Sequence, residues 1–413
     1  GWRSFGGEIY FTARWPQREV DYHGKRIGVI GTGSSGAQTI TALSREPVQR
    51  LTVFQRTPNF VVPAHNRPMS PEEEAAIKAD YAAYRQRART SGSGSVYEGP
   101  AAAVADMTDE EFDKHMEELL RVGGTSVLGG ISDLLTSPKA NERVQEYLRR
   151  EIRRRVHNPE VAEKLTPRGY YLGARRVIIE NGYLESFNFD HVELVDVKAD
   201  PIVEITADGV RTTNNFYPLD MLIFATGFDS GDGALRKIDI RGRDGVRLAD
   251  KWAAGPVTYI GLAVAGFPNM FCIAGPGSPS IRSNVMVSIE QHVEWMADLL
   301  SYAAGHGAEV VEATPQAEEQ WSTHVAEIVT STMLAKDDTQ YWGANVPGKP
   351  RVYLAYIGGV GAFRIICDDI RDRDYEGLVF RDADGNVIGD RSSGWSGPRR
   401  DGSIKTRFGN PII

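Results

Sequence analysis

Three glycines with the spacing Gly31-x-Gly33-x-x-Gly36 are the residues of this chain best suited to holding phosphate groups. The apolar run 26–30 (RIGVI) precedes them, and the helical stretch 37–46 (AQTITALSRE) follows. Gly31 permits a tight turn, Gly33 lets the backbone approach a pyrophosphate, and Gly36 lets the helix pack closely on the strand. The helix N-terminus adds unpaired N–H groups and a positive dipole end. A dinucleotide pyrophosphate is therefore expected on Gly31, Thr32, Gly33, Ser34, Ser35 and Gly36. A glycine-rich turn without a ligand is the alternative.

The end of the second predicted strand decides which nicotinamide cofactor fits. The run 51–54 (LTVF) ends on Gln55, Arg56 and Thr57, where no acid is present to bind the ribose 2′-OH of NAD. The guanidinium of Arg56 can instead form a charge-assisted pair with a 2′-phosphate. We therefore predict that NADPH binds here, with contacts from all three residues. An exposed arginine that contacts no ligand is the alternative.

These residues need a scaffold that brings them together. Strand, glycine turn, helix and second strand over 26–57 form one βαβ unit, which predicts an α/β fold with a doubly wound, Rossmann-like sheet. Strands are expected again over 172–222, and 58–171 is expected to be a helical insertion. Within that insertion, Ser70 and Thr108 begin capping boxes, the pattern that starts a helix.

The later part of the chain shows a different pattern. The run 270–274 (MFCIA) predicts a buried strand, and an amphipathic helix is expected after the loop 275–280 (GPGSPS). The apolar face of that helix is expected to contain Ile289, Val293, Met296 and Leu300. Residues 381–413 are polar and rich in glycine, which predicts a loosely ordered, non-catalytic extension.

Composition excludes several classes of protein. The 413 residues carry a formal net charge of −8, which argues against a nucleic-acid partner. The arginines of 149–155 are expected to lie on the solvated face of a helix. Cys272 and Cys367 lie in apolar contexts and indicate a reducing compartment. No apolar run reaches the ~18 residues that a membrane span needs. We therefore expect a cytoplasmic protein with no membrane partner and no metal.

Motifs spread along the chain resemble one enzyme family. Phe5-x-Gly7-x-x-x-Phe11-x-x-x-Trp15-Pro16 resembles the Baeyer–Villiger monooxygenase fingerprint FxGxxxHxxxW. The resemblance continues in order through 55–66, 173–176, 220–227, 275–280 and 343–352. It covers almost the whole chain up to about Val379 and is strongest to the phenylacetone and steroid monooxygenase branch.

The resemblance implies a specific chemistry. Members of this family use NADPH to reduce FAD, form a C4a-peroxyflavin with O₂, and insert one oxygen atom into a ketone to give an ester or lactone. Thioethers are a second class of substrate. Arg176 matches the family's catalytic arginine, whose guanidinium holds the negative charge that develops during the reaction. Arg175 is a weaker candidate for a contact with the phosphates or the nicotinamide.

The resemblance also implies further cofactor contacts and a domain plan. Ala225, Thr226 and Gly227 match a second dinucleotide-contact motif, and Asn284 follows the loop that lies over the flavin ring. The expected domains are a linker with the fingerprint (1–25), an NADPH-binding domain (26–57 and 172–222), the helical insertion (58–171), the C-terminal part of an FAD-binding domain (223–380) and the polar extension (381–413).

The chain departs from the family pattern at three places. Phe11 replaces the fingerprint histidine, so any polar contact of that side chain is lost. Gln340 replaces a tryptophan of a loop that closes on NADP, and Trp342 lies two places later. The family's FAD-pyrophosphate turn lies upstream of the fingerprint, and this sequence has only one such glycine turn. We therefore expect a fragment that lacks the FAD-binding N-terminus; a split enzyme with a separate FAD-binding chain, or a degenerate chain, are the alternatives.

These departures keep other functions open. A related flavin enzyme acting as an NADPH oxidase or as an S- or N-oxygenase is one alternative. A non-catalytic NADP-binding subunit is another. Substrate identity and oligomeric state are not specified by any of these motifs.

Overall fold

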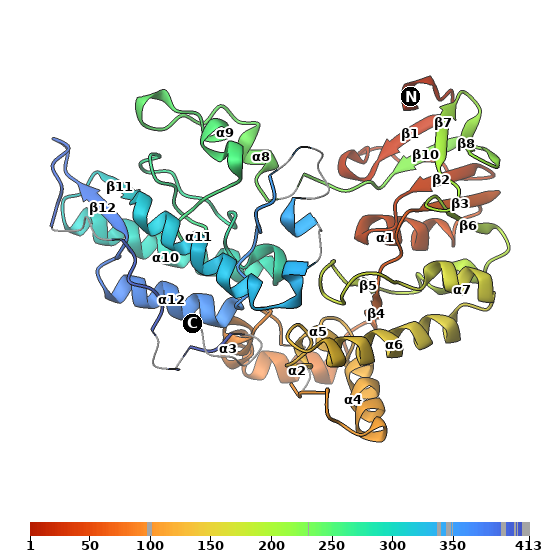
Figure 1. The fold of residues 1–413 in the computed structure, drawn as a ribbon, viewed down its shortest axis with the longest axis horizontal. Coiled ribbons are helices and arrows are strands. Elements are labelled where there is room, and N and C mark those ends of the chain that lie inside the picture. Colours follow the sequence, from red (N-terminus) through yellow and green to blue (C-terminus); the bar gives the residue numbers. More distant parts are fainter. Residues whose placement is uncertain are drawn as a thin grey trace. The chain divides into compact units, whose positions relative to one another are not determined.

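The computed structural model describes residues 1–96, 101–229, 231–336, 340–343, 348, 350–389, 394–399, 402 and 404–406. The chain divides into two compact units, whose elements Figure 1 labels. Unit 1 consists of Gly1–Arg67, Met107–Gly124 and Lys139–Phe228. Unit 2 consists of Pro68–Asp106, Thr125–Pro138 and Asp229–Ile413.

A five-stranded parallel sheet forms the centre of unit 1 (Figure 1). In spatial order its strands are β1 (Glu8–Phe11), β10 (Met221–Phe224), β2 (Arg26–Ile30), β3 (Arg50–Gln55) and β6 (Val192–Asp196). The interior of β2 and β3 is buried, which explains the nearly continuous apolar sequence of both strands. The predicted βαβ unit is thus confirmed. The segment expected to be a linker, 1–25, supplies β1 as an edge strand of this sheet.

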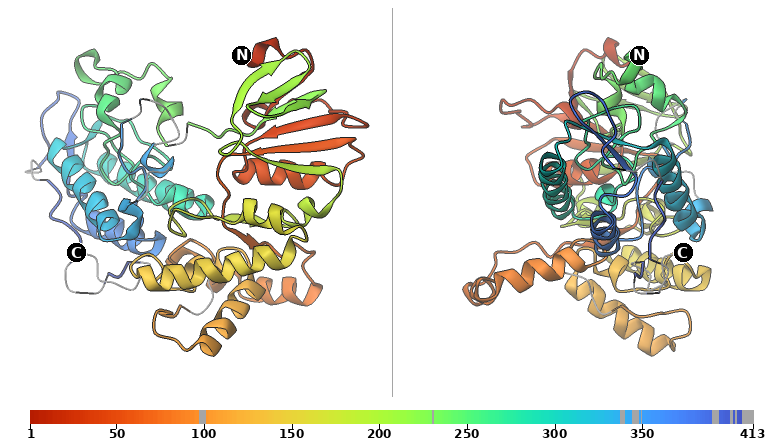
Figure 2. Two further views of the ribbon diagram at one scale, coloured as in Figure 1. Left: turned by 45° about the vertical axis from the view of Figure 1, so that its right-hand side comes forward. Right: turned by 90° about the vertical axis from the view of Figure 1, so that its left-hand side faces the viewer.

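Different layers cover the two faces of the sheet. On one face, α1 (Ser34–Leu43) buries Ile40 against Ile27 and Val29. On the other face, Phe54 and Leu222 pack with the antiparallel sheet of β7 (Ile202–Thr206), β8 (Gly209–Thr212) and β9 (Phe216–Pro218). The left view of Figure 2 shows α1 against the parallel strands. The α/β, Rossmann-like prediction is confirmed, with a small sheet on the face where a doubly wound fold has helices.

The predicted helical insertion is divided between the two units. Unit 1 contains α4 (Asp109–Val122), nearly all of α6 (Pro138–Arg155) and α7 (Pro159–Leu165), with the parallel pair β4 (Val61–Pro63) and β5 (Ile178–Glu180). Unit 2 contains α2 (Pro71–Ala79), α3 (Tyr81–Thr90) and α5 (Ser126–Gly129). Both predicted capping boxes are present. The hydroxyls of Ser70 and Thr108 accept from the backbone N–H of Glu73 and Glu111, the third residues of α2 and α4, and those carboxylates accept from the N-cap backbone N–H in return.

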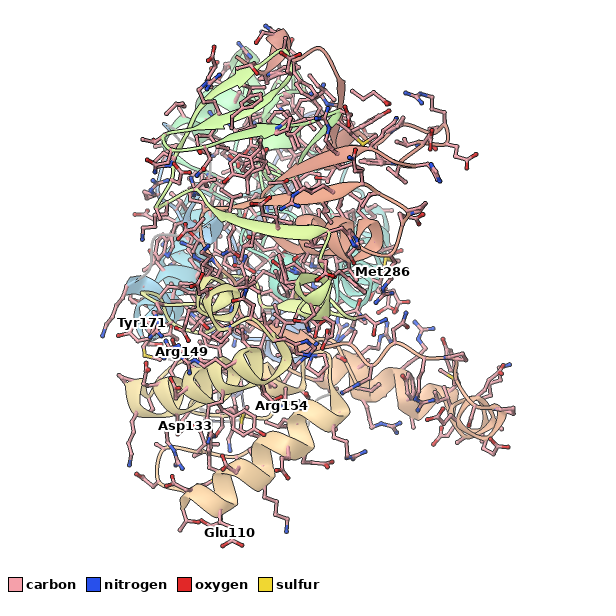
Figure 3. The ribbon with its side chains drawn as sticks, turned by 90° about the vertical axis from the view of Figure 1, so that its right-hand side faces the viewer. Glu110, Asp133, Arg149, Arg154, Tyr171 and Met286 are labelled. Atoms are coloured by element: carbon pink, nitrogen blue, oxygen red, sulfur yellow. The ribbon has the colours of Figure 1, made fainter. Side chains whose placement is uncertain are left out.

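Arg149 of α6 is not on a solvated face. Figure 3 labels it together with Arg154 on this helix. Arg149 is 7% exposed, and its guanidinium donates to the Pro167 carbonyl at 3.0 Å and to Gln145 Oε1 at 2.7 Å. Arg154 is exposed and pairs with Glu151. The sequence prediction is therefore right for Arg154 and wrong for Arg149, because Arg149 finds acceptors inside the unit.

Arg155 ends α6 in a largely buried ion cluster. Its guanidinium donates to the carboxylates of Glu180 and Glu185, each at 2.7 Å. Glu180 is 5% exposed and also accepts from the N–H groups of Gly182 and Tyr183. Burial opposes the charge of Arg155, but the hydrogen bonds and negative charges of Glu185 and Glu180 outweigh it and raise the pKa of the guanidinium. This cluster ties α6 to the end of β5.

Unit 2 is mainly helical. Its remaining helices and strands are α8 (Gly233–Arg236), α9 (Leu248–Lys251), α10 (Val285–Gly305), β11 (Val310–Ala313), α11 (Pro315–Thr330), α12 (Val360–Asp372) and β12 (Leu378–Arg381). Strands β11 and β12 form an antiparallel pair. None of the helices in the described part of the chain combines the length and apolar composition that crossing a membrane requires.

The sequence prediction for 270–274 is wrong, and that for the buried face of α10 is wrong in part. Residues 270–274 form no strand beyond an isolated bridge of Phe271, because Asn269 (φ 56°) and Ala274 (φ 57°) turn the chain at both ends. In α10, Val293 and Leu300 are 50% and 52% exposed. Met296 is buried as predicted, and the rest of the buried face contains Ser288, Gln291, His292, Trp295, Leu299 and Ala303. The large indole of Trp295 lies in the core, so the helix is rotated from the predicted orientation.

The polar extension also contributes to the core of unit 2. Trp395 is 4% exposed and lies 5.3 Å from both Trp321 and His324, measured between ring centroids. Its backbone N–H donates to Gln320 Oε1 at 2.7 Å. The prediction of loose order is therefore wrong at this residue, because one buried indole removes a large apolar area from water.

Replacing Glu180 by Gln should lower the stability of unit 1 by about 3 kcal/mol, because the largely buried Arg155 loses one of its two counter-ions. The measurement is urea unfolding followed by circular dichroism. Glu193→Gln is the matched control, since its pair with Arg50 is exposed and should contribute less than about 1 kcal/mol. Equal effects of the two substitutions would contradict the prediction.

Candidate functional site

The glycine turn follows β2 and leaves almost no room for side chains at two of its three glycines. A Cβ on Gly31, whose φ is 108°, would lie 2.4 Å from the Ala225 carbonyl oxygen. A Cβ on Gly36 would lie 2.2 Å from the Gly31 carbonyl oxygen. A Cβ on Gly33 would meet nothing within 4 Å. Gly31 and Gly36 are therefore required by packing, whereas the absence of a side chain at Gly33 leaves open space beside the backbone.

The N-terminus of α1 faces that open space with unused donors. Gly33 is the N-cap residue, and no side chain caps the helix. The N–H groups of the first helical residues, including Ser34 and Ser35, have no partner within the helix. With the positive end of the helix dipole they form an anion site. This cradle fits the pyrophosphate of a dinucleotide, which is the group that the sequence predicts here.

The end of β3 lies beside the glycine turn. The Thr32 hydroxyl donates to the Thr57 carbonyl at 3.4 Å, and the side-chain amide of Asn59 donates to the Thr32 carbonyl at 2.9 Å. Arg56 is exposed and forms no ion pair with any described residue. Its guanidinium is thus available to a 2′-phosphate, which fits NADPH.

Gln55 has a mainly structural environment. It is 2% exposed, and its side-chain amide donates to the Lys164 carbonyl at 2.7 Å. Its own carbonyl accepts from the Val197 N–H at 2.9 Å. These bonds join β3 to α7 and to the segment after β6. These bonds give Gln55 a structural role, and its contact with a cofactor stays a prediction.

The second predicted contact segment also lies against the turn. The Ala225 N–H donates to the Ile30 carbonyl at 2.8 Å, directly after the ladder between β10 and β2. Thr226 follows, and Gly227 has a φ of 97° with no atom within 4 Å of a built Cβ. The fold therefore brings 31–36, 55–57 and 225–227 to one edge of the sheet, at the carboxyl ends of its strands.

An ion pair fixes the start of β10. Asp220, the first residue of the DxxxxATG motif, receives two hydrogen bonds from the Arg26 guanidinium, at 2.7 and 3.0 Å. Hydrogen bonds from Arg26 lower the pKa of the Asp220 carboxyl. This acid therefore holds strands β2 and β10 in register rather than contacting a ligand.

The two candidate arginines lie in the loop that leads into β5. The Arg175 guanidinium lies over the Tyr170 ring, 4.8 Å from its centroid. The Tyr170 hydroxyl donates to the Pro58 carbonyl at 2.9 Å, next to the Asn59 that contacts the glycine turn. Arg176 is exposed. Hydrogen bonds thus connect this loop to the turn, while the catalytic role of Arg176 stays a prediction.

Asn284 belongs to unit 2, whereas the other predicted site residues belong to unit 1. Its side chain accepts from the Met286 N–H at 3.2 Å and so caps α10. Its backbone N–H donates to the Ser93 carbonyl at 2.7 Å. In the preceding loop, the hydroxyls of Ser278 and Ser280 are 2.7 Å apart. The side chain of Gln340 and residues 344–347 lie outside the described residues.

Sequence reasoning missed two residues of this site. Asn59 and Tyr170 join the glycine turn to the loop of the candidate arginines. Asn59 could have been found from the sequence, because it is a polar residue shortly after the end of a predicted strand. No local signal marks Tyr170, because Pro58 is 112 positions away along the chain.

Comparison with known proteins identifies relatives along nearly the whole chain, although no protein-family model matches it. The 2-oxo-Δ3-4,5,5-trimethylcyclopentenylacetyl-CoA monooxygenase of Pseudomonas putida is 38% identical over 387 residues, which are 91% of this chain and 70% of that protein. The cyclohexanone 1,2-monooxygenase of an Acinetobacter species is 38% identical over 92% of this chain and 69% of its own length. A phenazine N-monooxygenase of Lysobacter antibioticus is 37% identical over 93% and 70%.

Solved structures give the same result. The NADP⁺-bound cyclohexanone monooxygenase of Rhodococcus sp. Phi1 has a TM-score of 0.88 at 40% identity, covering 93% of this chain and 72% of that one. An oxidised steroid monooxygenase bound to NADP has a TM-score of 0.86, also at 40% identity, covering 92% and 71%. These comparisons give no support for a separate FAD-binding partner chain. The chain belongs to the Baeyer–Villiger monooxygenase family, whose members are flavin-containing enzymes that bind FAD and NADP.

Proposed function

We propose that the glycine turn of unit 1 binds NADPH for a Baeyer–Villiger oxidation that this chain carries out on a ketone. The observation that supports this most is the cradle at the N-terminus of α1, with Gly33 open and Arg56 without an ion pair among the described residues. Pyrophosphate and 2′-phosphate are the two anionic groups that such a pair of sites recognises. The reaction consumes ketone, O₂, NADPH and a proton, and yields ester or lactone, NADP⁺ and water.

Bound FAD supplies the activation of O₂, with electrons from NADPH. Two buried atoms of α10 fit a polar ligand of this kind, because Gln291 Oε1 and His292 Nε2 have no hydrogen-bond partner among the described residues. His292 Nδ1 accepts from the Ala274 N–H at 3.0 Å, so the proton of the neutral ring is on Nε2. Burial, together with the charge of Arg364, lowers the pKa of His292 to about 4 and keeps the ring neutral at pH 7.

The role proposed for Arg176 is electrostatic. Its guanidinium stays charged at any working pH and donates in a planar fork. We assign it the stabilisation of negative charge that develops on the substrate carbonyl oxygen. Arg175, which lies over Tyr170, then orients the loop that carries Arg176.

Oxygenation of a heteroatom is the second candidate, supported by the phenazine N-monooxygenase among the relatives. Product analysis with a ketone, a thioether and an aromatic amine distinguishes the two reactions. Peroxide formed per NADPH consumed separates both from an oxidase. A cytoplasmic location stays a prediction.

Replacing Gly33 by Ala should weaken NADP⁺ binding about tenfold, because the new methyl occupies the space where the backbone meets the pyrophosphate. The melting temperature should not change, since Gly33 has a φ of −71° and no atom near its Cβ. Isothermal titration calorimetry and thermal melting measure the two effects. Gly36→Ala is the contrasting variant and should lower the melting temperature. Unchanged binding in Gly33→Ala would count against the cradle.

Replacing Arg56 by Gln should lower kcat/KM for NADPH about 10- to 100-fold, because one charge-assisted hydrogen bond to the 2′-phosphate is lost. The value for NADH should stay the same. Arg50→Gln is the matched control at the opposite end of β3, where the arginine pairs with Glu193. A variant that loses both cofactors equally would show that Arg56 does not read the 2′-phosphate.

Replacing Arg176 by Ala should lower ketone turnover about 100-fold or more, which is the usual effect of removing one donor to a developing oxyanion. NADP⁺ affinity should remain at the parent value. Arg168→Ala is the control, because Arg168 is an exposed arginine in the same loop and pairs with Glu163. Full turnover in Arg176→Ala would show that Arg176 does not stabilise the developing oxyanion.

A further inference from the structure

Three aromatic rings gather where β1 and β10 end. Phe11 and Phe224 are Cα partners in the parallel ladder, and their rings stack at 5.1 Å between centroids with 16° between planes. Trp2, in the 3₁₀ turn Trp2–Ser4, meets Phe11 edge-on at 5.4 Å and Phe224 at 6.2 Å. We refer to Trp2, Phe11 and Phe224 as the aromatic clamp. Such stacked and edge-to-face pairs contribute beyond the apolar area that they bury.

The clamp lies at a surface rather than in the core. Trp2 is 39% exposed, and Phe11 and Phe224 are half-buried. Two cations cover the outer faces: the Arg14 guanidinium lies 5.4 Å from the Phe11 ring centroid, and that of Arg3 lies 5.2 Å from the Trp2 ring. Cation–π contacts of this kind hold a partly exposed ring in one orientation. The clamp is therefore held from both sides.

The residue after the clamp packs directly on the glycine turn. Phe224 is followed by Ala225, whose N–H donates to the Ile30 carbonyl at 2.8 Å. A Cβ on Gly31 would lie 2.4 Å from the Ala225 oxygen, and a Cβ on Gly36 would lie 3.3 Å from the Ala225 methyl carbon. The backbone of the turn therefore lies so close to Ala225 that no side chain fits between them at Gly31 or Gly36. A shift of the β10 end by a few tenths of an ångström would therefore move the turn or separate it from Ala225.

A further bond joins the same two strand ends. The Thr12 hydroxyl, one residue beyond Phe11, donates to the Phe224 carbonyl at 3.5 Å. β1 is an edge strand, so it contacts β10 on one side only. Side-chain contacts across this ladder consequently determine how firmly the end of β10 is held.

We infer that Phe11 is a positioning residue for NADP binding: the aromatic clamp holds the end of β10, and Ala225 transmits that position to the pyrophosphate turn. This inference rests on the proposed function of the turn as the NADPH site. Phe11 replaces a histidine in the family pattern, so ring stacking on Phe224 takes the place of a polar contact. The phenylalanine is thus accommodated by the Phe224 ring and by the Arg14 guanidinium that lies over it.

The test compares NADP⁺ affinity with stability in the full 413-residue chain. Phe11→Leu keeps an apolar side chain but removes the ring, Phe11→Tyr keeps the ring, and Phe224→Leu removes its partner. Phe112→Leu is the control. Phe112 lies on α4 of the same unit, away from β1 and β10, and its ring makes an edge-to-face contact with Tyr147 of α6 at 6.0 Å between centroids. Calorimetric titration with NADP⁺ gives affinity, and thermal melting gives stability.

Phe11→Leu and Phe224→Leu should each weaken NADP⁺ binding about 3- to 10-fold, the loss expected when one ring pair no longer holds the site. The double variant should lose little more than either single variant, because both substitutions remove the same contact. Phe11→Tyr should bind NADP⁺ like the parent. Phe112→Leu should lower the melting temperature without changing affinity.

Three results would overturn the inference, and they differ in scope. If Phe11→Leu melts earlier but binds NADP⁺ like the parent, the clamp is packing only, and the proposed NADPH site stands. If the parent chain itself binds no NADP⁺, both the clamp's role and the proposed function of the turn are wrong. Additive losses in the double variant would show that the two rings act independently and would also refute the clamp.

Discussion

The close approach of Ala225 to the glycine turn is the constraint on which unit 1 depends. β2 and β10 are adjacent parallel strands, and their ends must come near enough for backbone to meet backbone. Only glycine at 31 and 36 allows this approach, and the small side chain of Ala225 completes it. The third glycine, Gly33, serves a different purpose, because its missing side chain leaves space rather than closing it. Gly31 and Gly36 are thus needed for packing, whereas Gly33 leaves space open beside the backbone.

Arginines in unit 1 lie in two physically distinct environments. Arg149 and Arg155 are largely buried, and each is surrounded by carboxylates, amides or carbonyls of the same unit. Removing water from a guanidinium is costly unless such partners replace it. Arg56 and Arg176 are exposed instead.

The helical insertion is tied to the candidate site through β5. The Arg155–Glu180 pair holds the end of this strand, and the loop of Arg175 and Arg176 comes directly before its start. At the other side of that loop, Tyr170 donates to the segment that follows β3. The loop is therefore anchored at both ends, with Arg175 half-buried over Tyr170 and Arg176 exposed.

The sequence by itself determined the βαβ unit, the glycine turn and the capping boxes, and it indicated NADP as the nicotinamide cofactor, because each depends on residues within about 30 positions of one another. It also placed the chain in its family through ordered motifs. Tertiary structure decided which face α10 buries, that Arg149 and Arg155 are enclosed, that Trp395 enters a core, and that Phe11 stacks on Phe224. Phe11 and Phe224 are 213 positions apart in the printed sequence, and only the pairing of β1 with β10 brings them together. A local pattern carries no information about such a partner, since burial and contact depend on packing between distant segments.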